Sequence, residues 1–308
     1  RLLDALVAEG RLTAGEAAIA ATLPTAEDII AEADSGGHTD FRPMPVLLPA
    51  MLLLRDRVVA EQGYDRPVRV GAAGGISTPA SVAAAFAMGA AFVVTGSVNQ
   101  ACVEAGTSDL VKAMLAQAGP ADVAKAPAGD MFEHGAHVQV LKRGTLFAMR
   151  GNQLYDLYKR HDGLDDLPAD VRDTLERTVF RMPLDQVWAR CEAFFAERDP
   201  AQLDRAATDP RHQMALVFRW YLGLSSRWAI AGEQDRAADL QIWCGPGMGA
   251  FNAWAKGSFL EDPEQRTVVQ IALNFLEGAA VITRAQQLRT FGVAVPPAAF
   301  RFSPRVLS

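Results

Sequence analysis

Glycines follow two apolar runs of this 308-residue chain, one strand–helix step apart. In VGAAGGIST (70–78), Gly74 and Gly75 stand between a predicted strand and a predicted helix start, and VTGS (94–97) repeats the arrangement with Gly96 and Ser97. A glycine lets an anion approach the backbone because it has no Cβ, and helix N-termini point unpaired amides at such an anion. The pair therefore predicts a phosphate site, although a single Gly-Gly after a strand is as often an ordinary turn. The dinucleotide fingerprint G-x-G-x-x-G does not occur in GAAGGI.

A histidine follows a second glycine pair at the end of the preceding predicted strand. In EADSGGHTD (32–40), Gly36 and Gly37 lead directly to His38. Strand ends of a parallel α/β fold gather on one face, so His38 is expected to face the same ligand as the phosphate glycines and to donate a hydrogen bond or exchange a proton. A turn histidine that only satisfies a backbone group is the alternative.

The remaining candidates for chemistry carry weaker signals. His134 and His137 are separated by Gly135, which favours a turn over a metal site, and no spacing typical of zinc ligands occurs. His161 and His212 are interpreted as solvated or capping residues. The glycine-rich loop CGPGMGAFN (244–252) is interpreted as close packing rather than a ligand site. The cysteines are far apart and are expected to be buried thiols: Cys102, Cys191 and Cys244.

Short β-prone runs alternate with helical patterns over the first 110 residues, which predicts a parallel sheet, open or closed into a barrel. Strands are expected at 28–33, at 68–73 and near 91–95. Helices are expected at 50–62, at 79–88 behind Thr78 and Pro79, and at 109–117 behind Ser108. Thr13 and Glu16 form a capping box for a further helix.

Beyond about residue 150 the pattern becomes helical, and all five tryptophans lie there. An apolar face with helical spacing covers 184–195, and Asp209-Pro210 and Asp262-Pro263 predict helix starts for 211–224 and 263–290. We therefore predict two domains, 1–150 and 151–308. The net charge of −6, without a basic cluster, excludes an ordinary nucleic-acid surface, and the apolar run 82–94 is too short to span a bilayer.

Seven segments together resemble one family. They are EADSGGHTD, VGAAGGIST, VTGSVNQ, KAPAGDMFE, VQVLKRGTLF, LVFRWYLGLSSRWA and QIWCGPGMGAFN. These segments are similar to motifs of the trans-acting enoyl reductases (the PfaD family) of trans-acyltransferase polyketide synthases and polyunsaturated-fatty-acid synthases. That family is a branch of the flavoenzymes related to 2-nitropropane dioxygenase.

The resemblance implies an α/β fold, the C-terminal part of a (β/α)8 TIM barrel followed by a mostly helical subdomain. It also implies FMN as cofactor and NADPH as reductant of the α,β double bond of an enoyl thioester on an acyl carrier protein. His38 would be catalytic. The cofactor-binding residues would be Gly36, Gly37, Ala73, Gly74, Gly75, Thr95, Gly96 and Ser97, with no metal. A cytoplasmic partner of a polyketide or fatty-acid synthase is expected, and a homodimer stays open.

The sequence contains only three of the eight strands that a barrel needs, so the N-terminal strands are expected to lie outside it. Two other functions stay open on these residues. One is a nitronate monooxygenase-like flavoenzyme, because the glycines and the histidine do not distinguish the branches. The other is a non-catalytic docking module for a carrier protein, which would bind no flavin.

Overall fold

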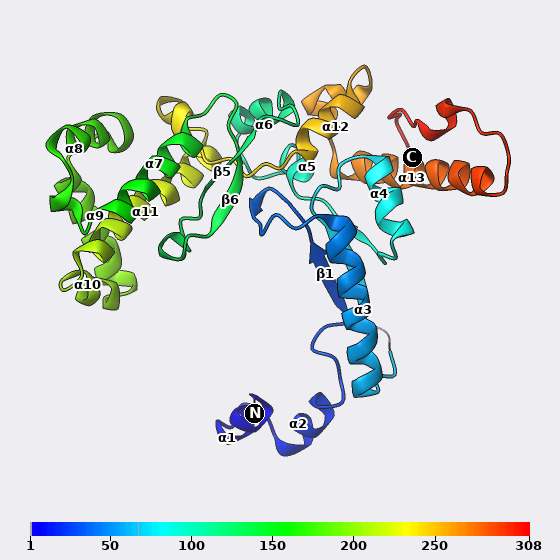
Figure 1. The fold of residues 1–308 in the computed structure, drawn as a ribbon, viewed down its shortest axis with the longest axis horizontal. Helices are drawn as coiled ribbons and strands as arrows, with labels where there is room; N and C mark the ends of the chain where they lie inside the picture. Colours follow the sequence, from blue (N-terminus) through cyan, green and yellow to red (C-terminus); the bar gives the residue numbers. More distant parts are fainter. Residues whose placement is uncertain (1, 67) are drawn as a thin grey trace. The chain divides into compact units, whose positions relative to one another are not determined.

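The computed structural model describes residues 2–66 and 68–308 (Figure 1). Contacts between its residues divide the chain into two compact units. The first unit contains the chain up to Asp34 together with Phe41–Thr95 and Phe275–Phe302. The second unit contains Ser35–Asp40, Gly96–Asn274 and Ser303–Ser308. The predicted domain boundary at residue 150 stays a prediction. The first residue of the predicted domain 1–150, Arg1, lies outside the described residues.

The first unit is built on three parallel strands in the order β1-β3-β4. The strands are β1 (Asp28–Glu32), β3 (Arg69–Ala73) and β4 (Val93–Val94), and Asp28 pairs with Arg69 at one end of the ladder. Val70 and Ala72 of the central strand are almost fully buried. All three predicted strands are therefore confirmed, with β4 shorter than expected.

Four of the described α-helices lie entirely within the first unit: α1 (Leu2–Ala8), α2 (Ala14–Ala20), α3 (Met44–Gln62) and α4 (Pro79–Ala87). Two of them, α2 and α4, begin at the caps that the sequence predicted. The Thr13–Glu16 capping box is present, and the Thr78 hydroxyl accepts a bond from the Ser81 amide, as N-cap side chains do. α3 begins at Met44, before the predicted helix start at residue 50, and Pro49 lies inside the helix.

The second unit contains an antiparallel sheet that the sequence patterns did not predict. Its order is β2-β6-β5, formed by β2 (Gly37–His38), β6 (His137–Leu141) and β5 (Val123–Pro127). Val123 pairs with Leu141, and His38 pairs with Val138. β5 reads VAKAP, and its alanine, lysine and proline are poor strand formers, so its sequence carries little strand signal.

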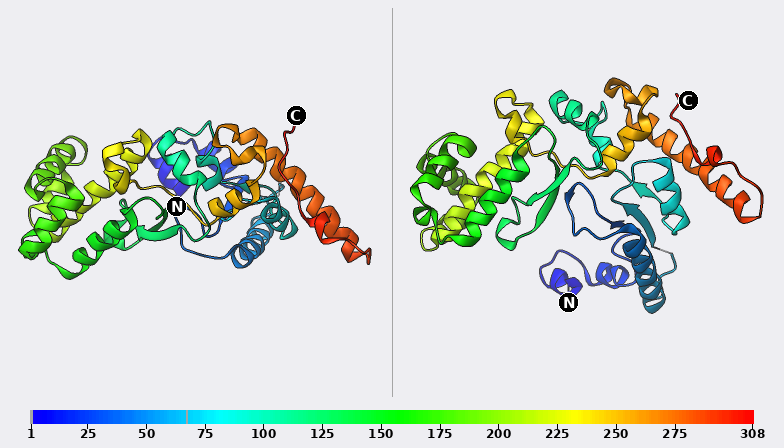
Figure 2. Two further views of the ribbon diagram at one scale, coloured as in Figure 1. Left: turned by 90° about the horizontal axis from the view of Figure 1, so that it is seen from above. Right: turned by 45° about the horizontal axis from the view of Figure 1, so that its top comes forward.

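Helices make up most of the rest of the second unit. They are α5 (Ser97–Gln100), α6 (Asp109–Ala116), α7 (Phe147–Arg160), α8 (Ala169–Leu175), α9 (Leu184–Arg198), α10 (Ala201–Ala206), α11 (Pro210–Ala231) and α12 (Gly247–Ala255). Ser108 caps α6 and Asp209 caps α11, as predicted. α7 and α11 lie side by side (Figures 1 and 2).

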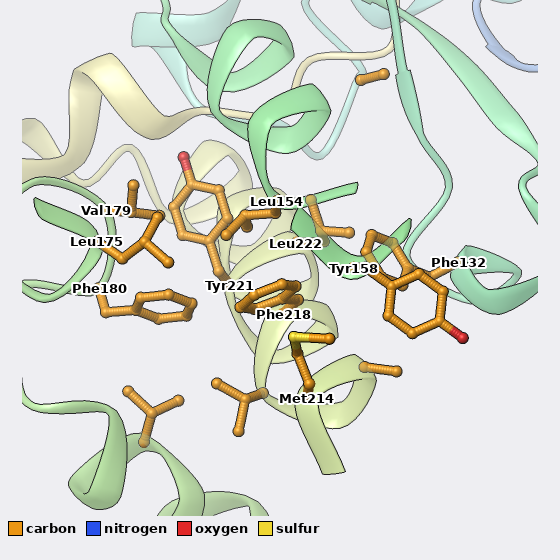
Figure 3. Packing of buried hydrophobic residues seen from close by; sticks show 14 of the residues in the cluster. Phe132, Leu154, Tyr158, Leu175, Val179, Phe180, Met214, Phe218, Tyr221 and Leu222 are labelled. Atoms are coloured by element: carbon orange, nitrogen blue, oxygen red, sulfur yellow. The ribbon is translucent and has the colours of Figure 1, made fainter. Parts of the chain in front are cut away.

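A large aromatic and aliphatic cluster holds these helices together (Figure 3). α11 contributes Met214, Phe218 and Tyr221, which meet Phe180 and Phe132 from outside the helix. The opposite face of α11 carries a different set of residues, and that face belongs to the site described below. α11 therefore has one face in the core and another available for a ligand.

The last long helix, α13 (Val268–Thr290), contributes residues to both units. Its predicted start at residue 263 is wrong, because Asp262 caps a single 3₁₀ turn, η6 (Pro263–Gln265), that ends before the helix begins. Length and composition would allow α13 to cross a membrane, and among the described helices it is the one that meets those two criteria. A core helix of a soluble protein meets them as well, and Gly278 lies so close to Pro79 that a Cβ there would be 2.7 Å from its ring.

Candidate active site

The sequence suggested that His38 ends the strand β1, but the structure places His38 in a short strand of its own, β2. Gly37 and His38 pair with Gln139 and Val138 of β6. Gly37 has a φ of 84° and lies against the Trp243 indole, where a Cβ would be 2.9 Å from Cε3. Only glycine fits that backbone and that close approach, so Gly37 fixes the position of His38.

A carboxylate holds the His38 ring. Nε2 of His38 lies 2.9 Å from Oδ1 of Asp130, and both side chains are partly exposed. Burial raises the pKa of the Asp130 carboxyl, but the hydrogen bond and charge of His38 oppose it, and the net pKa lies below the ordinary 3.8. Asp130 is therefore ionised at neutral pH and accepts the Nε2 proton. No described residue hydrogen-bonds Nδ1, the other ring nitrogen.

Trp243 forms the second support of His38. The two rings meet edge to face, with centroids 5.4 Å apart. The Trp243 carbonyl accepts a 2.7 Å bond from the Gln100 amide, and its backbone bridges to Val140 of β6. With the Gln241 amide oriented to satisfy its neighbours, its oxygen accepts a 2.9 Å bond from Trp243 Nε1. The indole is thus held from both its backbone and its ring.

His38 and Asp130 open onto a cavity of about 420 Å³ within the second unit. This volume lies in the range of small-molecule binding pockets. Most of its lining is apolar and comes from α9, α11 and the segment around Trp243: Phe194, Phe195, Leu216, Trp220, Leu222, Leu224 and Trp243. The polar lining groups include Arg219, Ser226 and Arg227. The cavity can accept an apolar molecule whose polar end reaches His38.

Arg219 ties this cavity to a polar cluster behind it. Its Nε donates a 2.8 Å bond to the Gly129 carbonyl, next to Asp130, and Nη1 lies 3.8 Å from Glu133. Glu133 also bonds His212, which is almost fully buried and whose other ring nitrogen meets Gln202. The interpretation of His212 as solvated or capping was wrong, because α11 turns its ring inward.

The glycine-rich loop at 244–252 packs tightly, as interpreted. A Cβ on Gly36 would lie 2.8 Å from the Gly245 nitrogen and from Ser97 Oγ. The Gly245 amide donates a 3.1 Å bond to that same hydroxyl. A Cβ on Gly249 would lie 2.1 Å from backbone atoms of Gly119 and Pro120. The structure thus brings Gly36 and Ser97 together through Gly245.

The two glycines after β3 differ in what they do. A Cβ on Gly74 would lie 2.4 Å from the Ala33 carbonyl oxygen, so packing of β1 against the end of β3 already requires glycine there. Gly75 also has a positive φ, 72°, but open space surrounds its Cβ position. Gly96, which N-caps α5, faces open space as well. Of the glycines predicted to bind phosphate, Gly75 and Gly96 are therefore the two whose Cβ positions are open.

The predicted site residues divide between the units. Ala73, Gly74, Gly75 and Thr95 lie in the first unit; Gly36, Gly37, His38, Gly96 and Ser97 lie in the second. Their common role in cofactor binding stays a prediction. Asp130 and Trp243 were missed, although both lie in segments that carry the family resemblance. Neither has a spacing pattern of its own that could have revealed it.

The cysteines and the remaining histidines add no metal chemistry. All three thiols are free and buried, and burial raises each pKa to about 12. Within residues 2–66 and 68–308, no group of three or more histidine, cysteine or acidic side chains could hold a metal. His134 ends a 3₁₀ turn that Gly135 closes with a φ of 73°, as the turn interpretation predicted.

Comparison with known proteins places this geometry in context. Residues 161–240 match the family model described as "[Acyl-carrier-protein] S-malonyltransferase, inserted helical domain". The chain is 45% identical over 314 residues to a polyunsaturated fatty acid synthase protein of Thraustochytrium sp., covering 98% of this chain and 21% of that protein. It is 44% identical over 281 residues to polyketide biosynthesis protein PksE of Bacillus subtilis, covering 91% and 36%.

A solved structure agrees with these relatives. The enoyl reductase domain of MlnA, from the macrolactin biosynthesis cluster of Bacillus amyloliquefaciens, superposes with a TM-score of 0.88 at 38% identity, covering 94% of this chain and 64% of that one. The fold is thus that of an enoyl reductase domain, and the expected α/β class is confirmed. The resemblance to the trans-acting enoyl reductases of polyketide and polyunsaturated-fatty-acid synthases is also confirmed. The chain spans about a fifth to a third of its curated relatives.

Proposed function

We propose that this chain is part of an FMN-dependent enoyl reductase that acts in trans and uses NADPH to reduce the α,β double bond of an acyl-carrier thioester. The observation that carries this proposal is the position of His38, which opens onto an apolar cavity in a fold shared with a solved enoyl reductase domain. Reduction of an enoyl thioester needs an apolar site for the acyl chain and a polar group where the thioester and the α-carbon lie.

Two glycines support the proposal that this region holds the phosphate of FMN. Gly75 and Gly96 each leave open the space that a Cβ would fill. Together with Ala73, Gly74, Thr95 and Ser97, they are the residues that would hold the phosphate. When bound, reduced FMN supplies the hydride that adds to the β-carbon.

The role of His38 follows from its hydrogen bond to Asp130. Because Asp130 accepts the Nε2 proton, a neutral His38 has no proton on Nδ1, and only the imidazolium can donate from that nitrogen. We propose that Nδ1–H of protonated His38 stabilises the negative charge that develops on the thioester during reduction, or delivers the proton to the α-carbon.

The names of the relatives support a proposal for the partner and the setting. Two of them are named as a component of a fatty acid synthase and a polyketide biosynthesis protein, and the model that matches 161–240 comes from an acyl-carrier-protein transferase. We therefore propose an acyl carrier protein of such a synthase as the bearer of the substrate, in the cytoplasm. A homodimer stays a prediction.

Replacing His38 tests the catalytic assignment in the intact protein. We expect His38→Ala to keep bound FMN, seen by its absorbance, and to slow reduction of an enoyl-carrier thioester by NADPH about 10²-fold or more. His161→Ala is the matched control, because His161 also bonds an aspartate, Asp166, at 2.9 Å but lies outside the cavity. A wild-type rate in His38→Ala would remove His38 from the mechanism.

Replacing Gly75 tests the phosphate assignment. Gly75→Asp places a Cβ and a negative charge in the open space, so we expect loss of FMN retention. Gly63→Asp is the control, because Gly63 also has a positive φ, 64°, and an open Cβ position, and it ends α3 in the same unit. Both substitutions place a side chain at a positive φ, so equal flavin retention would refute the assignment.

A further inference from the structure

One of the residues with which α11 lines the cavity beside His38, Gly223, has no side chain. Leu216, Arg219, Trp220, Gly223, Ser226 and Arg227 line the cavity from this helix. At 3.6 residues per turn these positions share one face, opposite the core face of Met214, Phe218 and Tyr221. Gly223 lies at the centre of the cavity face, and nothing lies within 4 Å of its Cβ position.

A glycine in the middle of a 22-residue helix is unfavourable for helix stability. Gly223 has no compensating backbone need in this structure, because its φ is not positive and no neighbour would collide with a Cβ. Gly129, which lies directly beside this part of α11, is different: a Cβ there would lie 3.2 Å from Leu222 Cβ and 4.0 Å from the Gly223 nitrogen. Local packing therefore does not explain Gly223, whereas the open space in front of it is part of the cavity.

We propose that this cavity is the binding site for the hydrocarbon part of the acyl chain and that Gly223 determines how long a chain it accepts. The inference rests on the proposed function and names the substrate class of the same site. The aromatic and aliphatic lining suits a linear alkyl chain, and His38 and Asp130 supply the polar end at which the thioester would lie. Among the further polar lining residues, which include Ser226 and Arg227, Arg219 is held by Gly129 and Glu133, so it does not need the ligand as a partner.

Gly223→Leu tests this proposal in the intact, flavin-loaded protein. Leucine favours the helix and meets no neighbour at its Cβ, so the variant should fold and fill the cavity. The probes are two saturated thioesters that cannot be reduced, butanoyl-pantetheine and dodecanoyl-pantetheine, and their affinities are measured by calorimetry. Gly106→Leu is the control, because its Cβ position is also open but lies outside the cavity lining.

Each buried methylene strengthens binding about fourfold. We therefore expect the wild type to bind the dodecanoyl probe much more tightly than the butanoyl probe. Gly223→Leu should weaken dodecanoyl binding about tenfold or more and leave butanoyl binding within about twofold, while Gly106→Leu changes neither. Ser226→Leu, on the same face, should act in the same direction and provides a second variant if Gly223→Leu does not fold.

Unchanged dodecanoyl binding in both variants, or an equal loss for both probes, would overturn the proposal. Reduction assays with 2-butenoyl and 2-dodecenoyl thioesters separate this failure from that of the proposed function. If the wild type reduces neither, enoyl reduction is refuted, while the binding data still decide whether the cavity holds the chain. If it reduces both and Gly223→Leu impairs neither, the activity stands and the chain lies elsewhere.

Discussion

Asp239 is a buried carboxylate surrounded by positively charged side chains. We expect its replacement to lower the stability of the second unit. Asp239 ends the 3₁₀ segment η4 (Gln234–Asp239) and is 0% exposed. Arg150 contacts one carboxylate oxygen, and Arg236 and Arg181 lie 3.2 and 3.3 Å from the other. The Tyr221 hydroxyl donates a 2.8 Å bond to the oxygen that Arg150 contacts, and burial together with this carboxylate raises the pKa of Tyr221.

Asp239→Asn preserves the shape and removes the charge. Two of the three guanidinium groups are themselves mostly buried, with Arg150 and Arg236 side chains 12% and 14% exposed. Removing one partner of a buried ion pair leaves the other charge without compensation and costs about 3–5 kcal/mol. We expect the free energy of unfolding of the second unit to fall by about that amount. Gln241 and Trp243 follow directly in the chain, so the cavity should lose its shape as well.

Urea denaturation followed by tryptophan fluorescence measures this loss, because all five tryptophans lie in the second unit. Asp185→Asn is the control. Asp185 bonds Arg172 at 2.6 Å but is 88% exposed, so its loss should cost about 0–1 kcal/mol. If Asp239→Asn costs no more than Asp185→Asn, the buried charge cluster does not stabilise the fold and the reasoning is wrong.

Three further outcomes are expected. Gly249→Ala should destabilise the second unit by about 1–3 kcal/mol in the same urea assay, because its Cβ would meet backbone atoms of Pro120 at 2.1 Å; stability equal to wild type would contradict this contact. An NMR titration should give Asp130 a pKa below 3.8, so the ion pair with His38 stays intact at neutral pH and is lost as the pH falls through the pKa of Asp130. In His38→Ala this pKa should rise, and an unchanged pKa would argue against the hydrogen bond between the two side chains. A disulfide reagent should modify the thiols of Cys102, Cys191 and Cys244 only after unfolding, since burial raises their pKa to about 12. Rapid reaction of the native protein would refute their burial.

The sequence by itself determined the elements whose signals are local. Thr78, Ser108 and Asp209 each accept a bond from an amide three residues away, so a few neighbouring residues contain the whole N-cap signal. The parallel strands at 28–32 and 69–73 follow in the same way from short apolar runs. The resemblance to enoyl reductases added the fold and the expected cofactor, and did so from seven separate segments.

Only the tertiary structure decided how the candidate site is assembled. The sheet β2-β6-β5 joins His38 to segments about a hundred residues later, and the bond between His38 and Asp130 spans 92 positions. The same holds for the inward turn of His212 and for the different surroundings of Gly74 and Gly75. Such contacts leave no pattern in a local stretch of sequence, because the two contacting side chains lie far apart in the chain. They depend on how distant segments pack, and no single segment encodes that packing.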